Sequence, residues 1–503
     1  MVFRRFVSQW CPFWRRTLSA EPVLEDFNRP RRKEFFFCRE SRKEMANTTP
    51  HETLTAPPNL PELKPNVAGI DIGAEEIYVA IPCGQNHSQV RHFPTFTQDL
   101  HELTAWLLEN KVREVAMEST GVYWIPLFQI LEAQGICVCL VNARHLKNVP
   151  GRKTDVKDAV WLQRLFSFGL LNASFRPDQH ICAIRTVMRH RATLVEQASS
   201  HVQRIQKSLT QMNVLLHTVI ADIVGKSGLA ILDAILAGER DRNALVLLCD
   251  VRIKATPEVI AKSLEGDYRP EHLFTLQQSL ALYRMAQEMI AACDRQLESL
   301  MAQMGLPSDP DAPVPPTTKT TRRDGKALTF AQSDPREEFY RLFGTDLTQV
   351  PGIHLGVVAT LFSELGTDVS AFPTVGHFCS WLGLCPGSKI SGGCVLSSKT
   401  RKVVSRVSSV LRMAAQGLRR SPSELGDYYR KMCARLGKAA GVTATAHKLA
   451  RILYHLITTR TAYAETSLVA QTERNRLRNE KKLRQKAGQL GFALVAITAE
   501  GTA

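Results

Sequence analysis

The feature that most restricts the fold of this chain lies in residues 67–82. There, "VAGIDIG" and "EEIYVAIP" alternate between apolar and polar or small residues, and a short turn separates them. Such alternation predicts two half-buried strands, and the short connection makes them an antiparallel hairpin. A third, more polar strand is expected near "QVRHF". This part of the chain therefore starts with three consecutive antiparallel strands.

The residues that follow alternate between helix and strand. Amphipathic helices are expected over 98–110 and 122–134, "REVAME" and "GICVCLVN" are expected as buried strands, and a last helix is expected over 155–169. Three antiparallel strands followed by alternating helices and strands is the order of an RNase H-like α/β domain, which we predict over 67–180. Periodicity alone leaves other α/β folds open.

Residues 181–304 predict a helical coiled-coil region, because apolar residues recur there in steps of three and four. The first seam comprises Val195, Ala198, Val202, Ile205, Leu209, Met212 and Leu216. The second comprises Tyr283, Ala286, Ile290, Cys293, Leu297, Leu300 and Met304. The two arms are expected to pack as an antiparallel coiled coil or against a second copy, with ordinary core packing as the alternative.

The remaining segments are assigned by composition. A proline-rich linker or insertion is expected over 305–345, and a helical domain over 346–460, where "VPGI" suggests a helix-hairpin-helix turn. A basic helix and tail follow over 461–503, and 1–66 is expected to be a disordered leader. We interpret its first 44 residues as upstream translated sequence, since an ordinary leader opens at Met45.

Charge points to a polyanionic partner. The 503 residues contain 64 Lys and Arg against 48 Asp and Glu, a net charge of +16, which favours nucleic acid over a membrane surface. Residues 385–420 contain eight Lys or Arg and no acid. No apolar run reaches the roughly 18 residues that a membrane span needs. The twelve cysteines form no C-x-x-C pair, so we expect buried free thiols in a reducing cytoplasm.

Four carboxylates form the candidate metal site. Asp71 lies inside the first strand, Glu118 ends the strand "REVAME", and Asp155 and Asp158 are three positions apart on the last helix of this domain. Cleavage of a phosphodiester with Mg²⁺ needs several hard oxygen ligands from different elements. Taken singly, Asp155 and Asp158 are also ordinary helix-start acids, Glu118 a helix-start acid and Asp71 a turn residue.

Basic residues accompany these acids. Arg152, Lys153 and Lys157 flank Asp155 and Asp158, so the acids are expected to hold metal while the bases hold the DNA strand. "GIDIG" also resembles the first phosphate motif of actin-like ATPases and sugar kinases. A second phosphate loop is missing downstream, which leaves a kinase as a minor alternative.

Several motifs together resemble the DEDD-type insertion-sequence transposases, the bridge-RNA-guided recombinases. They are "GIDIG", "AMESTGVYW", "GRKTDVKDAVWL", "VPGIHLGVVATLFSELG", "FCSWLGLCPGSKISGGCVLSSKT", "LRMAAQGL" and "TATAHKLARILYHL". The resemblance implies a RuvC-like domain, a coiled-coil region and a helical transposase domain with a nucleophilic serine. It also implies Mg²⁺ or Mn²⁺, donor and target DNA, a guide RNA, a homo-oligomer (dimer or tetramer), no membrane, and the bacterial cytoplasm at the nucleoid.

Position by position, the resemblance assigns the metal to Asp71, Glu118, Asp155 and Asp158 and the nucleophile to Ser391 in "KISGGCVL". A phosphoserine link conserves the energy of the cut bond for strand exchange. The competing serines nearby are Ser388, Ser397, Ser398, Ser405, Ser408 and Ser409. Cys394 stands where the family has a basic residue. The expected DNA-contacting residues are Arg152, Lys153, Lys157, Lys389, Lys399, Arg401, Lys402, Arg406 and Arg412.

Two other functions stay open at this stage. A RuvC-like, Mg²⁺-dependent endonuclease such as a junction resolvase would use water as the nucleophile and form no covalent intermediate. A nucleic-acid-binding protein without catalysis would carry the same acids for structural reasons, and Asp155→Asn would then leave every activity intact.

Overall fold

A computed structural model describes residues 62–84, 87–119, 121–142, 155–304, 328–401, 403–464 and 483–493, together with Leu477 and Glu480. The chain divides into two compact units, Met1–Ala173 and Ser174–Ala503, and each is described by itself. Among the described helices, none combines the length and apolar character that crossing a bilayer requires.

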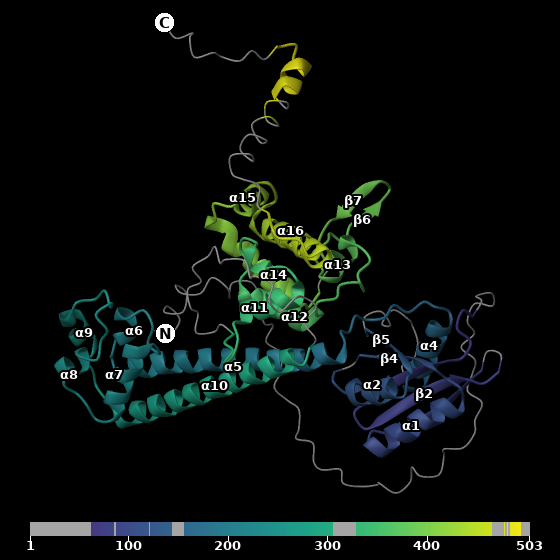
Figure 1. The fold of residues 1–503 in the computed structure, drawn as a ribbon, viewed down its shortest axis with the longest axis horizontal. Helices are drawn as coiled ribbons and strands as arrows, with labels where there is room; N and C mark the ends of the chain where they lie inside the picture. Colours follow the sequence, from purple (N-terminus) through teal and green to yellow (C-terminus); the bar gives the residue numbers. More distant parts are fainter. Residues whose placement is uncertain are drawn as a thin grey trace, which may run out of the picture. The chain divides into compact units, whose positions relative to one another are not determined.

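The first unit contains a five-stranded mixed sheet in the order β3-β2-β1-β4-β5 (Figure 1). Its strands are β1 Val67–Ile72, β2 Glu76–Pro82, β3 Ser88–Pro94, β4 Glu114–Glu118 and β5 Cys137–Val141. Its helices are α1 Thr97–Glu109, α2 Trp124–Ala133 and α4 Asp155–Ser167. β1, β2 and β3 pair antiparallel, whereas β4 and β5 join parallel to β1. The predicted hairpin is confirmed, and the strand order is that of an RNase H-like domain.

The two faces of this sheet carry different helices. Ala68, Ile70, Val115 and Met117 share a core with residues of α1 and α2. On the opposite face, side chains from β1, β4 and β5 form a smaller core with Phe166 of α4. Because side chains alternate along a strand, the odd positions of β1 and the even positions of β4 face α4.

The second unit contains a long helical pair (Figure 1). α5, Gln179–Gln211, and α10, Pro270–Ala302, run antiparallel, because Arg191 pairs with Asp294 near one end and Ser208 with Thr275 near the other. Most of the predicted seam positions are buried, and residues of α5 and α10 share a small core. A supercoil remains a prediction. Between the two helices lie α6 Leu216–Val219, α7 Lys226–Leu236, α8 Arg242–Val246 and α9 Pro257–Ser263.

The rest of the second unit packs around one large core. Its elements are α11 Pro335–Phe343, the 3₁₀ helix η1 Leu347–Gln349, α12 Leu355–Leu365, α13 Val375–Trp381, β6 Lys389–Ser391, β7 Cys394–Ser397, α14 Arg406–Gly417, the 3₁₀ helix η2 Leu418–Arg420, α15 Glu424–Leu436 and α16 Lys438–Thr459. Ile181 and Met301, from the start of α5 and the end of α10, are buried in the same core. The arms and the C-terminal helices therefore share one hydrophobic core.

Two sequence expectations are corrected in the described residues. The predicted linker extends too far, because Leu328 and Phe330 are buried and 335–343 form α11, whose apolar face packs into the large core. Residues 305–327 lie outside the described residues. The thiols of Cys83, Cys137 and Cys394 are exposed rather than buried, because Cys137 and Cys394 are the first residues of their strands, and alternation alone does not show where a sheet face ends.

Asp346, directly before η1, is a buried carboxylate with several donors. Burial raises its pKa, but hydrogen bonds from Thr348, Arg336 and Gln349 outweigh burial and lower the pKa below its ordinary value of 3.8. The Arg336 guanidinium lies 2.5 Å from the carboxylate, and the side chain of Gln349 donates at 3.0 Å. The ionised form is therefore favoured in the folded protein.

We expect Asp346→Asn to lower the free energy of unfolding by about 2 kcal/mol at pH 7, since it loses charge-assisted hydrogen bonds. Because the folded pKa is below the unfolded one, this contribution is present above pH 3.8 and disappears as the pH falls through the folded pKa. Denaturation of both proteins between pH 7 and pH 3 tests this. A difference that stays constant across that range would contradict it.

Candidate active site

The structure places the predicted acids at the ends of neighbouring elements of the first unit. Asp71 lies on β1, and Glu118 is the last residue of β4. Asp155 and Asp158 lie in the first turn of α4. β1 and β4 are adjacent and parallel, and Ile70 pairs with Met117, so Asp71 and Glu118 follow at the same level of the two strands.

The side chains of Asp71 and Glu118 also project from the face of the sheet on which α4 packs. Gly69 pairs with Ala116, and the backbone of Ala159 and Gln163 covers Gly69 directly. Asp71 and Glu118 are each two residues further along their strands, and side chains two residues apart share a face. Both carboxylates therefore project from the face that α4 covers.

The direction of α4 brings its first turn level with Asp71. The backbone amides of Leu63 and Lys64 donate to the carbonyl of Ser167, at the last residue of α4. Gly69 lies against Ala159 and Gln163, so α4 runs antiparallel to β1. Advancing two residues on a strand, about 6.6 Å, corresponds to about four residues of helix. That step leads from Ala159–Gln163 to the turn with Asp155 and Asp158.

The donor set suits a hard divalent cation, because all four candidates offer carboxylate oxygens. Among the residues whose side chains the structure describes, no three or more His, Cys, Asp and Glu lie close enough together to hold a metal ion. The side chain of Asp155 is outside that set. The described geometry therefore places three acids at one end of one sheet face, without gathering them around a common point.

Lys157 is exposed on α4, between the two aspartates. Arg152 and Lys153 lie outside the described residues. The first turn of α4 thus presents positive as well as negative charge.

Ser391 is the last residue of β6 in a two-stranded antiparallel hairpin of the second unit (Figure 1). Gly392 and Gly393 form the turn with φ of 55° and 78°, the left-handed region that a two-residue hairpin turn needs and that glycine adopts without strain. Ser391 is exposed, pairs with Cys394 across the turn, and its hydroxyl forms no hydrogen bond with the described residues. Its oxygen is accessible to a large substrate.

Most of the competing serines have local roles. Ser405 caps α14 by accepting from the Ser408 amide, Ser409 donates to the Ser405 carbonyl, and Ser408 itself is buried. The Ser397 hydroxyl accepts a hydrogen bond from the backbone amide of Lys399. Ser388 and Ser398 are exposed but lie outside the two strands. Ser391 is the exposed serine next to the turn.

The basic residues near the hairpin differ in their surroundings. Lys389 and Lys399 are exposed. Arg401 donates to the backbone and the hydroxyl of Ser380, at 2.6 and 3.0 Å, and Arg406 lies 4.0 Å from Glu364. Arg412 is half-buried, and Lys402 lies outside the described residues. Among the described cations of this set, Lys389 and Lys399 are the exposed ones whose side chains form no hydrogen bond or ion pair with the described residues.

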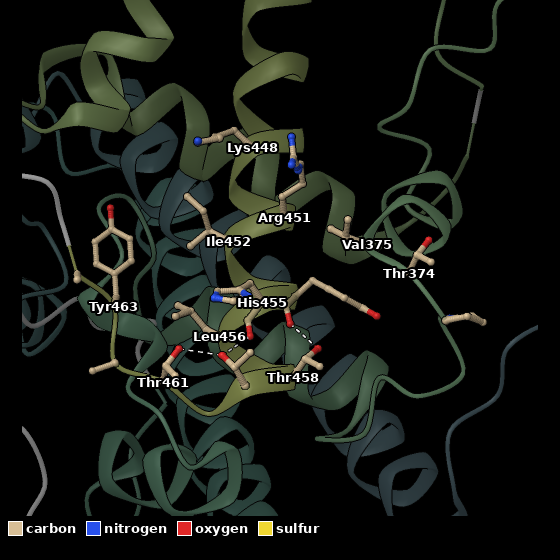
Figure 2. A pocket seen from close by; sticks show the side chains of 15 residues that line it. Thr374, Val375, Lys448, Arg451, Ile452, His455, Leu456, Thr458, Thr461 and Tyr463 are labelled. Carbon is tan, nitrogen blue, oxygen red and sulfur yellow. Dashed lines mark hydrogen bonds between the residues drawn. The ribbon is translucent and has the colours of Figure 1, made fainter. Parts of the chain in front are cut away.

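Sequence reasoning did not select a groove beside α16, shown in Figure 2. Lys448, Arg451 and His455 line it at helical spacing i, i+3 and i+7. The signal was present in "AHKLARILYHL", where three basic residue types fall on one helix face. The three residues are separated by apolar ones, so they form no run of consecutive charges in the sequence.

Comparison with known proteins finds family matches for two segments of the chain. Residues 68–214 match a transposase family model of the DEDD type named for IS110, and residues 344–430 match the model described as the transposase IS116/IS110/IS902 family. No curated protein matches the chain significantly. The first match covers the sheet from Ala68 onward, with its acids, and all of α5, and the second covers the hairpin with Ser391. In these two segments, in this order within one chain, the protein is similar to transposases of the IS110 family.

Proposed function

We propose that this protein is a transposase that cuts and rejoins DNA through a serine-linked intermediate. Ser391 is the nucleophile, and Asp71, Glu118, Asp155 and Asp158 hold the divalent cation. The observation that carries the proposal is the position of Ser391, exposed beside a turn of two left-handed glycines and without a hydrogen bond to the described residues. A nucleophile at such a place can approach a phosphate without steric interference from neighbouring side chains.

The chemistry balances within the DNA and the serine. The Ser391 oxygen attacks the phosphorus and loses its proton, while the bond from phosphorus to the 3′ oxygen breaks and that oxygen takes up a proton. The product is a 5′-phosphoserine link and a free 3′ hydroxyl. Because the phosphodiester energy is kept in the link, attack by another 3′ hydroxyl reverses the step on a new partner strand.

The carboxylates supply the oxygen ligands that Mg²⁺ or Mn²⁺ prefers. A bound divalent ion would neutralise the charge that develops on the phosphate oxygens. Lys157, Lys389 and Lys399 are positioned on exposed surfaces to attract the DNA backbone. We place the metal-binding acids of one copy with the serine of another, in a dimer or tetramer.

The proposal includes selection of donor and target DNA by a structured guide RNA. It is supported by the similarity of two segments to the IS110 family and by the net charge of +16, which suits a protein that binds two polyanions. In such systems, base pairing selects the sequence and the protein contacts mostly backbone.

The deciding experiment traps the covalent intermediate. The full chain is incubated with Mg²⁺, its flanking RNA and a plasmid that contains the element's ends. The reaction is then denatured and digested with nuclease, and peptides are searched for a nucleotide-linked serine by mass spectrometry. We expect wild type to give the adduct at Ser391, Ser391→Ala to give none, and Ser398→Ala, the matched exposed serine, to retain it.

The rival endonuclease makes a different prediction for the same assay. If water is the nucleophile, nicked DNA accumulates with no attached protein, and Ser391→Ala cuts as well as wild type. Either result would exclude the serine mechanism while leaving the similarity to transposases intact.

A further inference from the structure

A groove of about 680 Å³ lies between α16, the segment before α13 and the residues that follow α16 (Figure 2). Lys448 and Arg451 lie at its upper rim, Thr374 and Val375 on one side, and Tyr463 on the other (Figure 2). Its lining residues belong to one compact unit, and none of them lies on β6 or β7, the hairpin of Ser391. The groove is therefore a feature separate from the candidate nucleophile.

The cations of the groove have no carboxylate partners in the described part of the chain. Arg451 forms neither a hydrogen bond nor an ion pair with the described residues, and the Lys448 ammonium group lies 6.0 Å from the centroid of the Tyr428 ring. None of the fifteen lining residues is an acid. Most arginines elsewhere in this unit are paired, so this face retains an uncompensated positive potential.

The walls of the groove are anchored to the body of the domain. The Tyr454 hydroxyl donates to the carbonyl of Phe372 at 2.7 Å and fixes the segment before α13. On the opposite side, Thr345 donates to the carbonyl of Thr461 at 2.8 Å and fixes the residues after α16. The groove is held open by these bonds and does not have to form around a ligand.

The lining combines cations with apolar and aromatic surface. Ile452 and Leu456 lie between the rim and the floor, and Tyr463 contributes a ring that is half-buried against the large core (Figure 2). A purely ionic ligand such as free phosphate has no use for this apolar surface. Grooves that bind unpaired nucleic acid combine cations for the phosphates with aromatic rings on which bases stack.

We propose that this groove binds an unpaired segment of a nucleic acid strand, with its phosphates at Lys448 and Arg451 and a base against Tyr463. Lys448 and Arg451 are three residues apart on α16, about 4.5 Å along its axis, so their long side chains can reach successive phosphates of one strand. The inference requires a nucleic-acid partner, as the proposed function does, but it requires neither Ser391 nor the metal-binding acids.

The test measures binding of fluorescent 12-nucleotide single strands of DNA and RNA to the full chain by anisotropy at several salt concentrations. We expect Lys448→Gln/Arg451→Gln to weaken binding by about tenfold or more and to reduce the salt slope by about 1.4, since two phosphate contacts are lost. Tyr463→Leu removes the stacking ring, so it weakens binding by about tenfold while the salt slope stays unchanged.

A matched control removes the same charges elsewhere. Lys262→Gln/Arg295→Gln changes one exposed lysine and one exposed arginine on α9 and α10. If this control weakens binding as much as the groove variant, or if the groove variant binds like wild type, the proposal is wrong. Preference for one oligonucleotide identifies RNA or DNA as the ligand. This assay measures binding without cleavage, so the absence of a Ser391 adduct in the trapping experiment would leave its result unchanged, and the two failures are distinguished.

Discussion

Gly69→Ala is expected to destabilise the first unit by about 3 kcal/mol or more and to abolish DNA cleavage, although it adds a single methyl group. A Cβ at this position would lie 2.2 Å from the Gln163 nitrogen and 2.3 Å from the Ala159 oxygen, which are backbone atoms and cannot rotate away. α4 would have to move off the sheet. Because α4 carries Asp155 and Asp158, the candidate metal site would be lost with it.

A loss of stability at Gly69 would be opposite to the usual effect of replacing glycine with alanine. In an open position of a strand, alanine stabilises a protein relative to glycine by roughly 0.5–1 kcal/mol, because glycine has more conformational entropy to lose. Gly417→Ala, at the last residue of helix α14, is the control for an unobstructed glycine, since a Cβ there meets nothing within 4 Å. Urea denaturation followed by circular dichroism and by tryptophan fluorescence, to which Trp161 of α4 contributes, compares the two. A Gly69→Ala protein as stable as wild type would contradict the packing of α4 on β1.

Asp294→Ala is expected to lower the free energy of unfolding of the second unit by about 3–5 kcal/mol, because it leaves the Arg191 charge buried without a partner. The two side chains are only 9% and 6% exposed, with one nitrogen–oxygen distance of 2.5 Å and another of 3.2 Å. Asp294 also accepts from the backbone amide of Thr329, so one carboxylate links α5, α10 and the segment before α11.

Two further variants distinguish the cost of leaving Arg191 without its partner from the net contribution of the Arg191–Asp294 pair to the free energy of unfolding. Arg191→Leu/Asp294→Leu removes both charges, and we expect it to recover most of the lost stability, since apolar residues often replace a buried pair at little cost. Asp233→Ala breaks the Arg284–Asp233 pair, whose side chains are about half exposed, and we expect a change below about 1 kcal/mol. Thermal and urea denaturation measure all three. Equal effects of Asp294→Ala and Asp233→Ala would show that burial does not control the energy of this pair.

The short-range pattern of apolar and polar residues was enough to predict most strands and helices of the first unit. Alternation between apolar and polar residues predicted β1, β2 and β3, and amphipathic spacing predicted α1 and α4, because both signals depend on near neighbours in sequence. The predicted helix of 155–169 is observed as α4, Asp155–Ser167. The linker after α10 was predicted too long, since nothing local shows that Leu328 and Phe330 are buried by distant helices.

For the candidate site too, some features followed from the sequence and others required the tertiary structure. Sequence identified Asp71, Glu118, Asp155 and Asp158 by residue type and element, and Ser391 by its motif. It could not show that Asp71 and Glu118 face α4, which depends on the pairing of Gly69 with Ala116 across two strands. It also could not identify the groove at Lys448 and Arg451, whose opposite wall comes from residues more than 70 positions earlier.

By itself, the sequence determined the strands and helices of the sheet unit, the positive charge and the residues that carry the candidate chemistry, because these follow from side-chain type and short-range periodicity. The tertiary structure alone decided which carboxylates share a face, which serine is exposed beside a glycine turn, and which cations lack a carboxylate partner. Those properties depend on close approach between segments far apart in the chain, such as the contact of Gly69 with Ala159 and Gln163. Backbone packing of that kind leaves no signal in the neighbouring residues.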